Sequence, residues 1–161
     1  MMSRICLFPG TFDPMTRGHL DLIDRAKPLF DHLIIGIGVN SAKQPMFSVE
    51  RRLKWCRDIY RGTPGISAET YEGLTVNFCR LVGARYILRG LRYLSDLEYE
   101  KSIAAMNRHL DPAVETIFLT TSPEFSMLTS TLVREVMHHG GDVSSFLPQQ
   151  ITSDIRGEKD F

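Results

Sequence analysis

The stretch Arg4-Ile-Cys-Leu-Phe-Pro-Gly10 decides the fold, because it is an apolar run that ends at a Pro-Gly pair. The run predicts a buried strand that ends at Phe8, and Pro9-Gly10 predicts the turn that closes it. Apolar residues then recur at helical spacing from His19 to Phe30, where a proline is expected to end the helix early. His32–Val39 follows as a second strand that is apolar throughout. Such a strand is typical of a parallel sheet covered by helices on both faces.

The rest of the chain continues this alternation. Ser48 is the expected N-cap of a helix that reaches about Tyr60, and Ser95-Asp-Leu-Glu98 has capping-box spacing. Helices are expected over 75–82, 95–110 and 130–139, and strands over 66–71, 86–88 and 116–119, with the more polar strand 66–71 at a sheet edge. The pattern predicts a single-domain, doubly wound Rossmann-like α/β fold with a five-stranded parallel sheet. One domain is expected over residues 1–161, with a polar, weakly helical tail from about 142.

The composition is that of a globular domain, with 161 residues (18.3 kDa), 43% hydrophobic and 24% charged. The 19 Lys and Arg balance the 19 Asp and Glu, so nucleic-acid binding through a broad basic surface is not expected. Three separated cysteines (Cys6, Cys56 and Cys79) indicate neither a disulfide framework nor a metal knuckle. The longest apolar run is too short to cross a bilayer, and the first eight residues lack the features of a signal peptide. We therefore expect a cytoplasmic protein that does not bind membranes.

The loop from Pro9 to His19 is the most informative part of the chain. In doubly wound sheets, ligands bind beyond the carboxyl ends of the strands, where the strand order reverses. Gly10 allows a ligand to approach the backbone, and Thr11 offers a hydroxyl and an amide. His19 falls in the first turn of a helix, where unpaired amides attract anions and an imidazole can donate to a phosphate oxygen. A lone histidine there is more often a cap or a packing residue, but the neighbouring Gly18 and Gly-Thr turn favour the functional interpretation.

Basic side chains and the first residues of a helix lie in the loops after other predicted strands, where they could also contact a ligand. Lys43 lies in the loop after the second strand and by itself would be interpreted as solvated. Arg89 and Arg92 lie on either side of Gly90-Leu91, and Gly90 would permit a tight turn that aims both guanidiniums at one place. Forked guanidinium donors match phosphate oxygens, although two solvated arginines fit the local sequence about equally well. Ser130-Thr131 opens a later helix whose amides would hold a triphosphate, in addition to ordinary capping.

Several motifs together resemble one known family. Gly10-Thr-Phe-Asp-Pro14 and Thr16-Arg-Gly-His19 resemble the (H/T)xGH signature of the nucleotidyltransferases related to class I aminoacyl-tRNA synthetases, with Thr16 in place of the commoner histidine. Downstream stretches are similar to the phosphopantetheine adenylyltransferases of coenzyme A biosynthesis: Lys43-Gln-Pro-Met-Phe47, Arg89-Gly-Leu-Arg92, Asp96-Leu-Glu-Tyr-Glu100, Met106-Asn-Arg-His109 and Thr129-Ser-Thr-Leu-Val-Arg134. The resemblance is colinear from about Arg4 to Pro148.

The resemblance implies adenylyl transfer from ATP to 4′-phosphopantetheine, giving dephospho-coenzyme A and pyrophosphate by direct in-line attack without a covalent intermediate. His19 would stabilise the transition state, and Lys43 and Arg92 would also be catalytic. The residues implied for phosphopantetheine are Thr11, Lys43, Leu74, Thr75 (where an apolar residue is familiar), Arg89 and Asn107. Those implied for ATP are Thr11, Phe12, His19, Gly90, Leu91, Arg92, Glu100, Phe125, Ser126, Met127, Leu128, Thr129, Ser130 and Thr131.

The expected cofactor is Mg²⁺, held mainly by ATP, since the sequence shows no dedicated carboxylate cage. The resemblance also implies a homohexamer. Coenzyme A is an expected feedback ligand because the product shares groups with the substrate.

Other interpretations remain open from the residues. The nearest is the same chemistry on another acceptor, such as nicotinamide mononucleotide or glycerol phosphate; a non-catalytic nucleotide sensor and a flavodoxin-like electron carrier are the others. Gly36-Ile-Gly38 lies inside a strand and is followed by Ser41, where a dinucleotide fingerprint needs glycine, and no P-loop motif occurs. His138-His139 is typical of a helix C-terminus rather than of a metal site.

Overall fold

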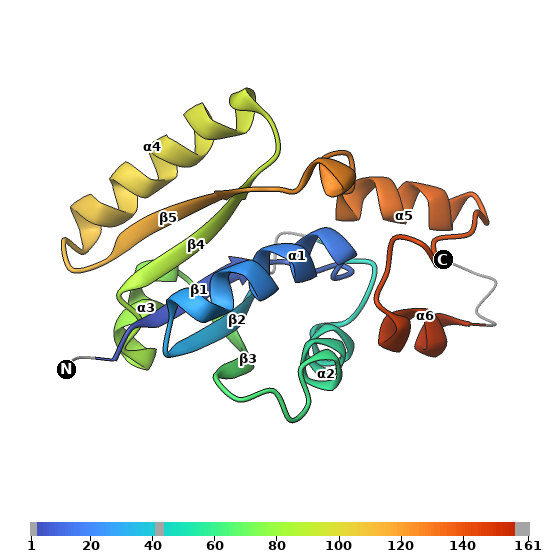
Figure 1. Cartoon of the computed structure of the whole chain (residues 1–161), viewed down its shortest axis with the longest axis horizontal. Helices are drawn as coiled ribbons and strands as arrows, with labels where there is room; N and C mark the ends of the chain where they lie inside the picture. The colour runs from blue at the N-terminus through green and yellow to red at the C-terminus, as the bar shows by residue number, and fades with distance from the viewer. Residues whose placement is uncertain (1–2, 41–43, 157–161) are drawn as a thin grey trace.

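The computed structural model describes residues 3–40 and 44–156, over which strands and helices alternate (Figure 1). The strands are β1 (Ile5–Gly10), β2 (His32–Val39), β3 (Ile66–Glu72), β4 (Tyr86–Leu91) and β5 (Glu115–Thr120). The helices are α1 (Arg17–Ala26), α2 (Val49–Ile59), α3 (Thr75–Val82), α4 (Leu94–Leu110), α5 (Ser130–His138) and α6 (Gln149–Ile155), with short 3-10 helices η1 (Lys27–Leu29) and η2 (Pro123–Phe125). Within the described residues, no helix has the length and apolar character needed to span a membrane.

The strands form one parallel sheet in the order β3-β2-β1-β4-β5. The chain builds outward from β1 to β2 and β3, then crosses to the other side of β1 to place β4 and β5. The strand order therefore reverses between β1 and β4. This topology confirms the doubly wound Rossmann-like prediction, and the more polar β3 lies at an edge as expected.

Helices cover both faces of the sheet, as successive residues of β1 show. Cys6 and Phe8 belong to the larger core, whereas Leu7 points to a smaller core on the opposite face, formed with α3. Four helices contribute buried side chains to the larger core, among them Ile23 (α1), Trp55 (α2), Met137 (α5) and Ile151 (α6). α4 packs against β4, β5 and α3. Burial on both faces explains why β1 and β2 read as continuous apolar runs.

Two strands run further than the sequence predicts. β1 continues through Pro9-Gly10, where a turn is predicted, because both residues pair with β2. β4 continues through Arg89-Gly90 to Leu91, paired with β5, so the tight turn predicted at Gly90 is wrong. Strand neighbours that are distant in sequence outweigh the local Pro and Gly signals.

Gly10 and Gly90 serve close packing rather than turns. A Cβ at Gly10 would lie 2.9 Å from the Phe12 ring, and one at Gly90 would overlap Leu22 Cδ1. Phe12 has a φ of 48°, in the left-handed region that non-glycine residues seldom adopt. Its ring lies across Gly10 and 5.1 Å from that of His19, measured between centroids.

Side chains and carboxylates set the helix starts. Ser48 caps α2 as predicted, since its Oγ accepts from the Arg51 backbone N–H at 3.3 Å. α4 begins after Tyr93, and the carboxylate that accepts the N–H groups at this end is that of Asp96. The capping box predicted at Ser95–Glu98 is therefore wrong, because the helix starts earlier in the chain.

The C-terminal segment is packed into the larger core. Val143, Leu147, Ile151 and Ile155 are buried, and α6 lies against α2. The prediction of a polar tail from residue 142 is therefore wrong in part: α6 is short, but every fourth residue from Val143 is apolar and buried. That spacing is the sequence signal the prediction missed.

Candidate active site

β1 and β4 separate at their carboxyl ends, where the strand order reverses. Within the described residues, the last position at which they pair is Leu7 with Ile87. Beyond it, Arg89 Nη1 donates to the Pro9 carbonyl oxygen at 3.0 Å. This gap is where doubly wound sheets bind their ligands.

Three adjoining pockets surround the gap. The Asn107 pocket, about 430 Å³, is lined by Thr11, Arg52, Tyr71, Thr75 and Asn107 among others. The His19 pocket, about 580 Å³, is lined by Phe12, Thr16, His19, Gly90, Arg92, Leu128 and Thr129 among others. The Arg134 pocket, about 350 Å³, is lined by Thr11, Phe12, His19, Ser130, Thr131 and Arg134 among others. Arg89 and Glu100 line both of the first two pockets, and His19 lines both of the last two.

His19 is oriented by the start of its own helix. The Thr16 backbone N–H donates to His19 Nδ1 at 3.0 Å, and the Thr16 hydroxyl lies 3.0 Å from the same atom. Because Nδ1 accepts, the neutral ring carries its proton on Nε2. The capping and packing roles that the sequence offered as an alternative are both present, and they hold an N–H donor at the site.

The surroundings of His19 keep the ring neutral. Burial, together with the positive charges of Arg92 and Arg89, lowers its pKa to about 4. At neutral pH the imidazole is therefore a hydrogen-bond donor without a charge of its own.

Arg89 and Glu100 form a bidentate ion pair between the Asn107 and His19 pockets. Arg89 Nε lies 2.7 Å from Glu100 Oε2, and Nη2 lies 2.6 Å from Oε1. With the bond to the Pro9 carbonyl, these contacts use three of the five guanidinium N–H groups. Within the described residues, one N–H on each terminal nitrogen is left for a ligand.

Arg92 is held separately from Arg89. Its Nε lies 3.3 Å from Asp96 Oδ2, and the residue lines the His19 pocket. The two arginines meet at this pocket, as predicted, but not through a turn at Gly90. Arg89 belongs to β4, and Arg92 lies just before α4.

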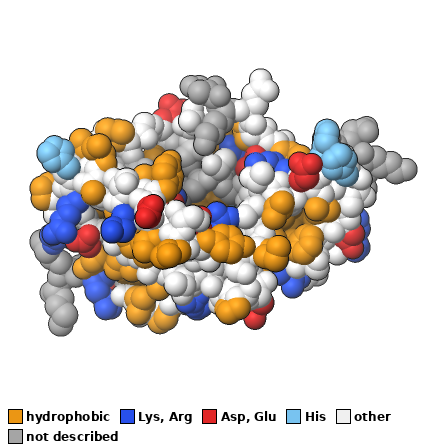
Figure 2. Space-filling model, turned by 90° about the horizontal axis from the view of Figure 1, so that it is seen from above, with side chains coloured by type: hydrophobic (Ala, Val, Ile, Leu, Met, Phe, Trp, Pro, Cys, Tyr) orange, Lys and Arg blue, Asp and Glu red, His pale blue; other side chains and the backbone are white. Residues whose placement is uncertain are grey.

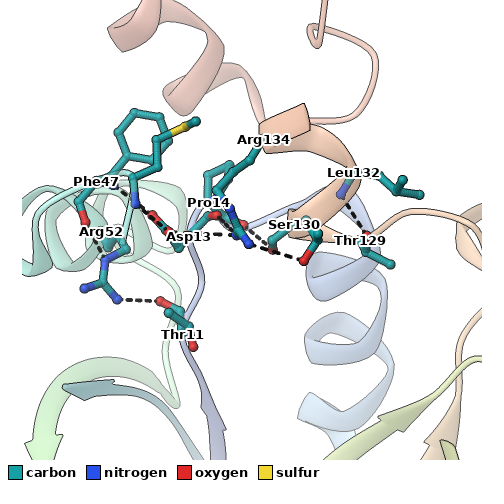
Figure 3. A network of polar contacts seen from close by, with 11 residues as sticks. Thr11, Asp13, Pro14, Phe47, Arg52, Thr129, Ser130, Leu132 and Arg134 are labelled. Atoms are coloured by element: carbon teal, nitrogen blue, oxygen red, sulfur yellow. Dashed lines mark hydrogen bonds and ion pairs between the residues drawn. The ribbon is translucent and has the colours of Figure 1, made fainter. Parts of the chain in front are cut away.

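The loop between β1 and α1 is tied to two other parts of the chain (Figure 3). Asp13 is buried, with 3% of the residue exposed. Its carboxylate accepts hydrogen bonds from the Met46 and Phe47 backbone N–H groups at 2.8 and 2.9 Å. Arg134 Nη1 donates to the Asp13 carbonyl oxygen at 2.6 Å. These contacts fix the loop that carries the (H/T)xGH residues.

The start of α5 is fixed against the same loop (Figure 3). Ser130 Oγ donates to the Pro14 carbonyl oxygen at 2.8 Å. Thr129 Oγ1 accepts from the Leu132 backbone N–H at 3.0 Å and caps the helix. The positive end of α5 consequently lies beside His19, in an arrangement suited to phosphate.

Most residues singled out from the sequence line the three pockets. These are Thr11, Phe12, His19, Thr75, Arg89, Gly90, Arg92, Glu100, Asn107, Leu128, Thr129, Ser130 and Thr131. Five others lie in the described chain without lining these pockets: Leu74, Leu91, Phe125, Ser126 and Met127. Lys43 lies outside the described residues. Glu100 and Asn107 both line the Asn107 pocket, which confirms that they share one face of α4.

Two arginines that line these pockets, Arg134 and Arg52, were not among the site residues predicted from the sequence. Arg134 lies one helical turn after Thr131 and donates to its hydroxyl at 3.2 Å, so the spacing within the Thr129–Arg134 motif was a usable signal. Arg52 lines the Asn107 pocket from α2 and belongs to none of the motifs quoted from the sequence. Only the packing of α2 against the loop after β1 brings it there.

This fold and this site define a class of nucleotide-handling proteins. Residues 7–136 match the family model described as cytidylyltransferase-like. A solved structure of a protein assigned as a nicotinate-nucleotide adenylyltransferase, from Vibrio parahaemolyticus, superposes with a TM-score of 0.74 over 98% of this chain and 94% of that one. Its sequence identity is 15%, so it shows a shared fold.

Curated relatives define the family more narrowly. A phosphopantetheine adenylyltransferase of Lachnoclostridium phytofermentans is 44% identical over 148 residues, 92% of this chain and 91% of that protein. One of Flavobacterium psychrophilum is 47% identical over 148 residues, 92% of this chain and 97% of that protein. The chain belongs to the phosphopantetheine adenylyltransferase family and is a nucleotidyltransferase. The resemblance stated from the sequence motifs is confirmed.

Proposed function

We propose that this enzyme transfers the adenylyl group of ATP to the phosphate of 4′-phosphopantetheine, giving dephospho-coenzyme A and pyrophosphate. The observation that carries the proposal is the position of His19, whose ring lines both the His19 pocket and the Arg134 pocket. A neutral Nε2–H donor there can reach an α-phosphate that joins a nucleoside in one pocket to a pyrophosphate in the other. The names of the curated relatives support the same pair of substrates.

The Asn107 pocket is the proposed acceptor site. Thr11 and Arg89 lie at its phosphate end, beside the gap between β1 and β4, and the two free N–H groups of Arg89 suit phosphate oxygens. Thr75 and Asn107 lie further along and can hydrogen-bond the amides of a pantetheine arm. Lys43 and Leu74 remain proposed acceptor residues by resemblance.

The other two pockets are the proposed nucleotide site. The His19 pocket, with Gly90, Arg92 and Leu128, would take the nucleoside end. The Arg134 pocket would take the β- and γ-phosphates at the α5 N-terminus, where Ser130, Thr131 and Arg134 supply donors. Arg134 adds to the residues that the resemblance implied. The ATP roles of Leu91, Phe125, Ser126 and Met127 remain predictions.

The proposed step is a direct displacement at phosphorus. An acceptor phosphate oxygen forms a bond to the α-phosphorus, the bond from that phosphorus to the bridging oxygen breaks, and pyrophosphate leaves with the electron pair. The attacking oxygen is already anionic, so no general base is needed. Catalysis then comes from alignment and from donors aimed at charge that develops on the α-phosphate, His19 above all.

The metal is proposed to arrive with the nucleotide. Within the described residues, no group of three His, Cys, Asp or Glu side chains is placed to hold an ion. The acidic side chains at the site, Asp13, Asp96 and Glu100, are each engaged by main-chain N–H groups or by an arginine. We propose that ATP would hold most of the Mg²⁺ ligands and that the ion would supply charge neutralisation at the phosphates.

Assembly, feedback and compartment are further parts of the proposal. We propose a cytoplasmic homohexamer inhibited by coenzyme A. Seen from above (Figure 2), hydrophobic side chains gather on the face that carries α4 and α5. Leu94 and Met106 of α4 are 82% and 59% exposed and offer apolar surface to a neighbouring subunit. Sedimentation velocity would test the hexamer.

The test of function is a panel of acceptors incubated with ATP or CTP and Mg²⁺, followed by mass detection of the products. Dephospho-coenzyme A from ATP and phosphopantetheine is expected. Adenylylation of nicotinamide mononucleotide or glycerol phosphate alone would overturn the proposed acceptor. Tight ATP binding without pyrophosphate release with any acceptor would indicate a nucleotide sensor instead.

A further inference from the structure

Arg52 is a buried cation that joins two loops of the site. Arg52 is 3% exposed and lines the Asn107 pocket from α2. Its Nε donates to the Phe47 carbonyl oxygen at 2.9 Å and its Nη1 to the Thr11 carbonyl oxygen at 2.6 Å (Figure 3). One guanidinium therefore connects the residue that follows β1 to the loop that precedes α2.

Asp13 makes the reciprocal connection. Its carboxylate accepts the backbone N–H groups of Met46 and Phe47, so both main-chain groups of Phe47 are bound by buried charged side chains. The two loops are thus joined in both directions by charge-assisted hydrogen bonds, which are stronger than neutral ones.

The joined loops form walls of the proposed substrate site. Thr11 and Pro45 each line both the Asn107 pocket and the Arg134 pocket. Arg89 approaches the same gap from the opposite side, through its bond to the Pro9 carbonyl. The separation between Thr11 and Arg89, the groups proposed to hold the acceptor phosphate, therefore depends on how Thr11 is held.

We propose that Arg52 is a positioning residue for the acceptor: it fixes the Thr11 main chain and the 44–47 loop, and so sets the shape of the acceptor-phosphate subsite. Burying the guanidinium of Arg52 costs free energy because the group loses its contacts with water. Its two partners are main-chain carbonyls, which water could bind equally well if the loops were open to solvent. A geometric role explains why such a cation is kept at a pocket wall. The identity of the acceptor rests on the proposed function, but the loop geometry does not.

The kinetic test is Arg52→Lys, with Arg57→Lys as the matched control. Lysine keeps the charge, but its compact head cannot bond two carbonyls in the guanidinium geometry. We expect KM for phosphopantetheine to rise about ten-fold and KM for ATP to change less than about three-fold, as for loss of one charge-assisted bond. Arg57 lies on the same helix and donates to the Ala68 carbonyl at 3.3 Å, away from the three pockets, so its variant should match the wild type.

The second test needs no turnover. Hydrogen exchange of the Met46 and Phe47 amides in the substrate-free protein should accelerate in Arg52→Lys and stay unchanged in Arg57→Lys. If Arg52→Lys does not fold, Arg52→Gln serves in its place with the same expectations, because the shorter, neutral glutamine amide cannot bond both carbonyls as the guanidinium does.

Equal rises in both KM values, or an unchanged KM for phosphopantetheine, would overturn the positioning role, as would unchanged exchange of the two amides. If the wild type makes no dephospho-coenzyme A, the proposed function fails, and the exchange result alone decides whether Arg52 holds these loops.

Discussion

The imidazole of His19 is oriented by groups of different chemistry. Thr16 occupies Nδ1 with a backbone N–H, and the Phe12 ring packs edge-on against the imidazole. Burial, followed by the positive charges of Arg92 and Arg89, holds its pKa low. Burial and the arginines favour the neutral ring, and the bond that Nδ1 accepts places the proton of that ring on Nε2. A donor fixed in advance costs no reorganisation when charge develops on a phosphate.

His19→Ala is expected to act mainly on turnover. Loss of one preorganised donor typically lowers kcat by about 100- to 1000-fold, and this donor is proposed to act in the transition state. The Kd for ATP, measured by calorimetry, should stay within about three-fold. Weakened ATP binding with turnover intact would contradict the assigned role.

The titration of His19 should be displaced to acid pH. Its pKa falls from the usual 6.5 to about 4, so folding favours the neutral ring. The contribution to stability is full above pH 6.5 and is lost as the pH falls through about 4. An NMR titration of the His19 ring, assigned by comparison with His19→Asn, should show no inflection between pH 5.5 and 8. A midpoint near 6.5 would show that the ring is solvated.

Glu100 is expected to act through Arg89. Both of its carboxylate oxygens contact the Arg89 guanidinium, although the resemblance assigns Glu100 to ATP. In Glu100→Gln one charge-assisted bond is lost, so KM for phosphopantetheine should rise about ten-fold while the Kd for ATP changes little. A large rise in the Kd for ATP with an unchanged acceptor KM would restore the nucleotide role.

Among the elements, β1 and β4 show how secondary structure creates the site. Each strand continues past the end that local signals predict, and the two no longer pair after Leu7 and Ile87. The gap between them is bridged by Arg89 rather than by main-chain hydrogen bonds. Helix starts complete the site, because α1 and α5 both direct their N-terminal ends toward it.

The start of α2 offers a test of capping. Ser48→Ala removes the acceptor of the Arg51 N–H and should lower the free energy of unfolding by about 1 kcal/mol. Ser102→Ala is the control, since Ser102 lies inside α4 and its hydroxyl bonds the Glu98 carbonyl of the same helix. Urea denaturation of both variants measures the difference. Equal stabilities would mean that the Ser48 bond contributes nothing net.

At the scale of the whole molecule, the C-terminal segment from Val143 to Ile155 forms part of the larger core. Leu147 is fully buried in the core that also holds residues of α1 and α2. Arg17 of α1 donates from its Nε to the Leu147 carbonyl at 3.1 Å, so the segment also supports the helix that carries His19.

Leu147→Ala should lower the free energy of unfolding by about 2 to 5 kcal/mol, because it leaves a cavity in a packed core. Leu81, 81% exposed on α3, is the matched control, and Leu81→Ala should change stability by less than about 0.5 kcal/mol. Thermal and urea unfolding measure both. Similar values for the two variants would mean that the segment is not part of the cooperative core.

Much of the fold follows from local patterns. Some features depend only on residues that are close together in the chain, so they can be recognised in the sequence. These are the apolar runs of β1 and β2, the spacing of apolar residues in α3 and the Ser48 cap of α2. The motifs around His19 and Ser130 could be recognised for the same reason, since each is one short segment. Together they sufficed for the doubly wound topology and for the family.

The remaining features arise where distant segments meet. Pro9 and Gly90 extend strands because partners lie beside them, and Arg52 reaches Thr11 because α2 packs against the loop after β1. Glu100 pairs with Arg89 across the end of the sheet, and the tail closes the core. Burial, ion pairing and strand pairing depend on distances between residues far apart in the chain, and those distances exist only after the chain has folded.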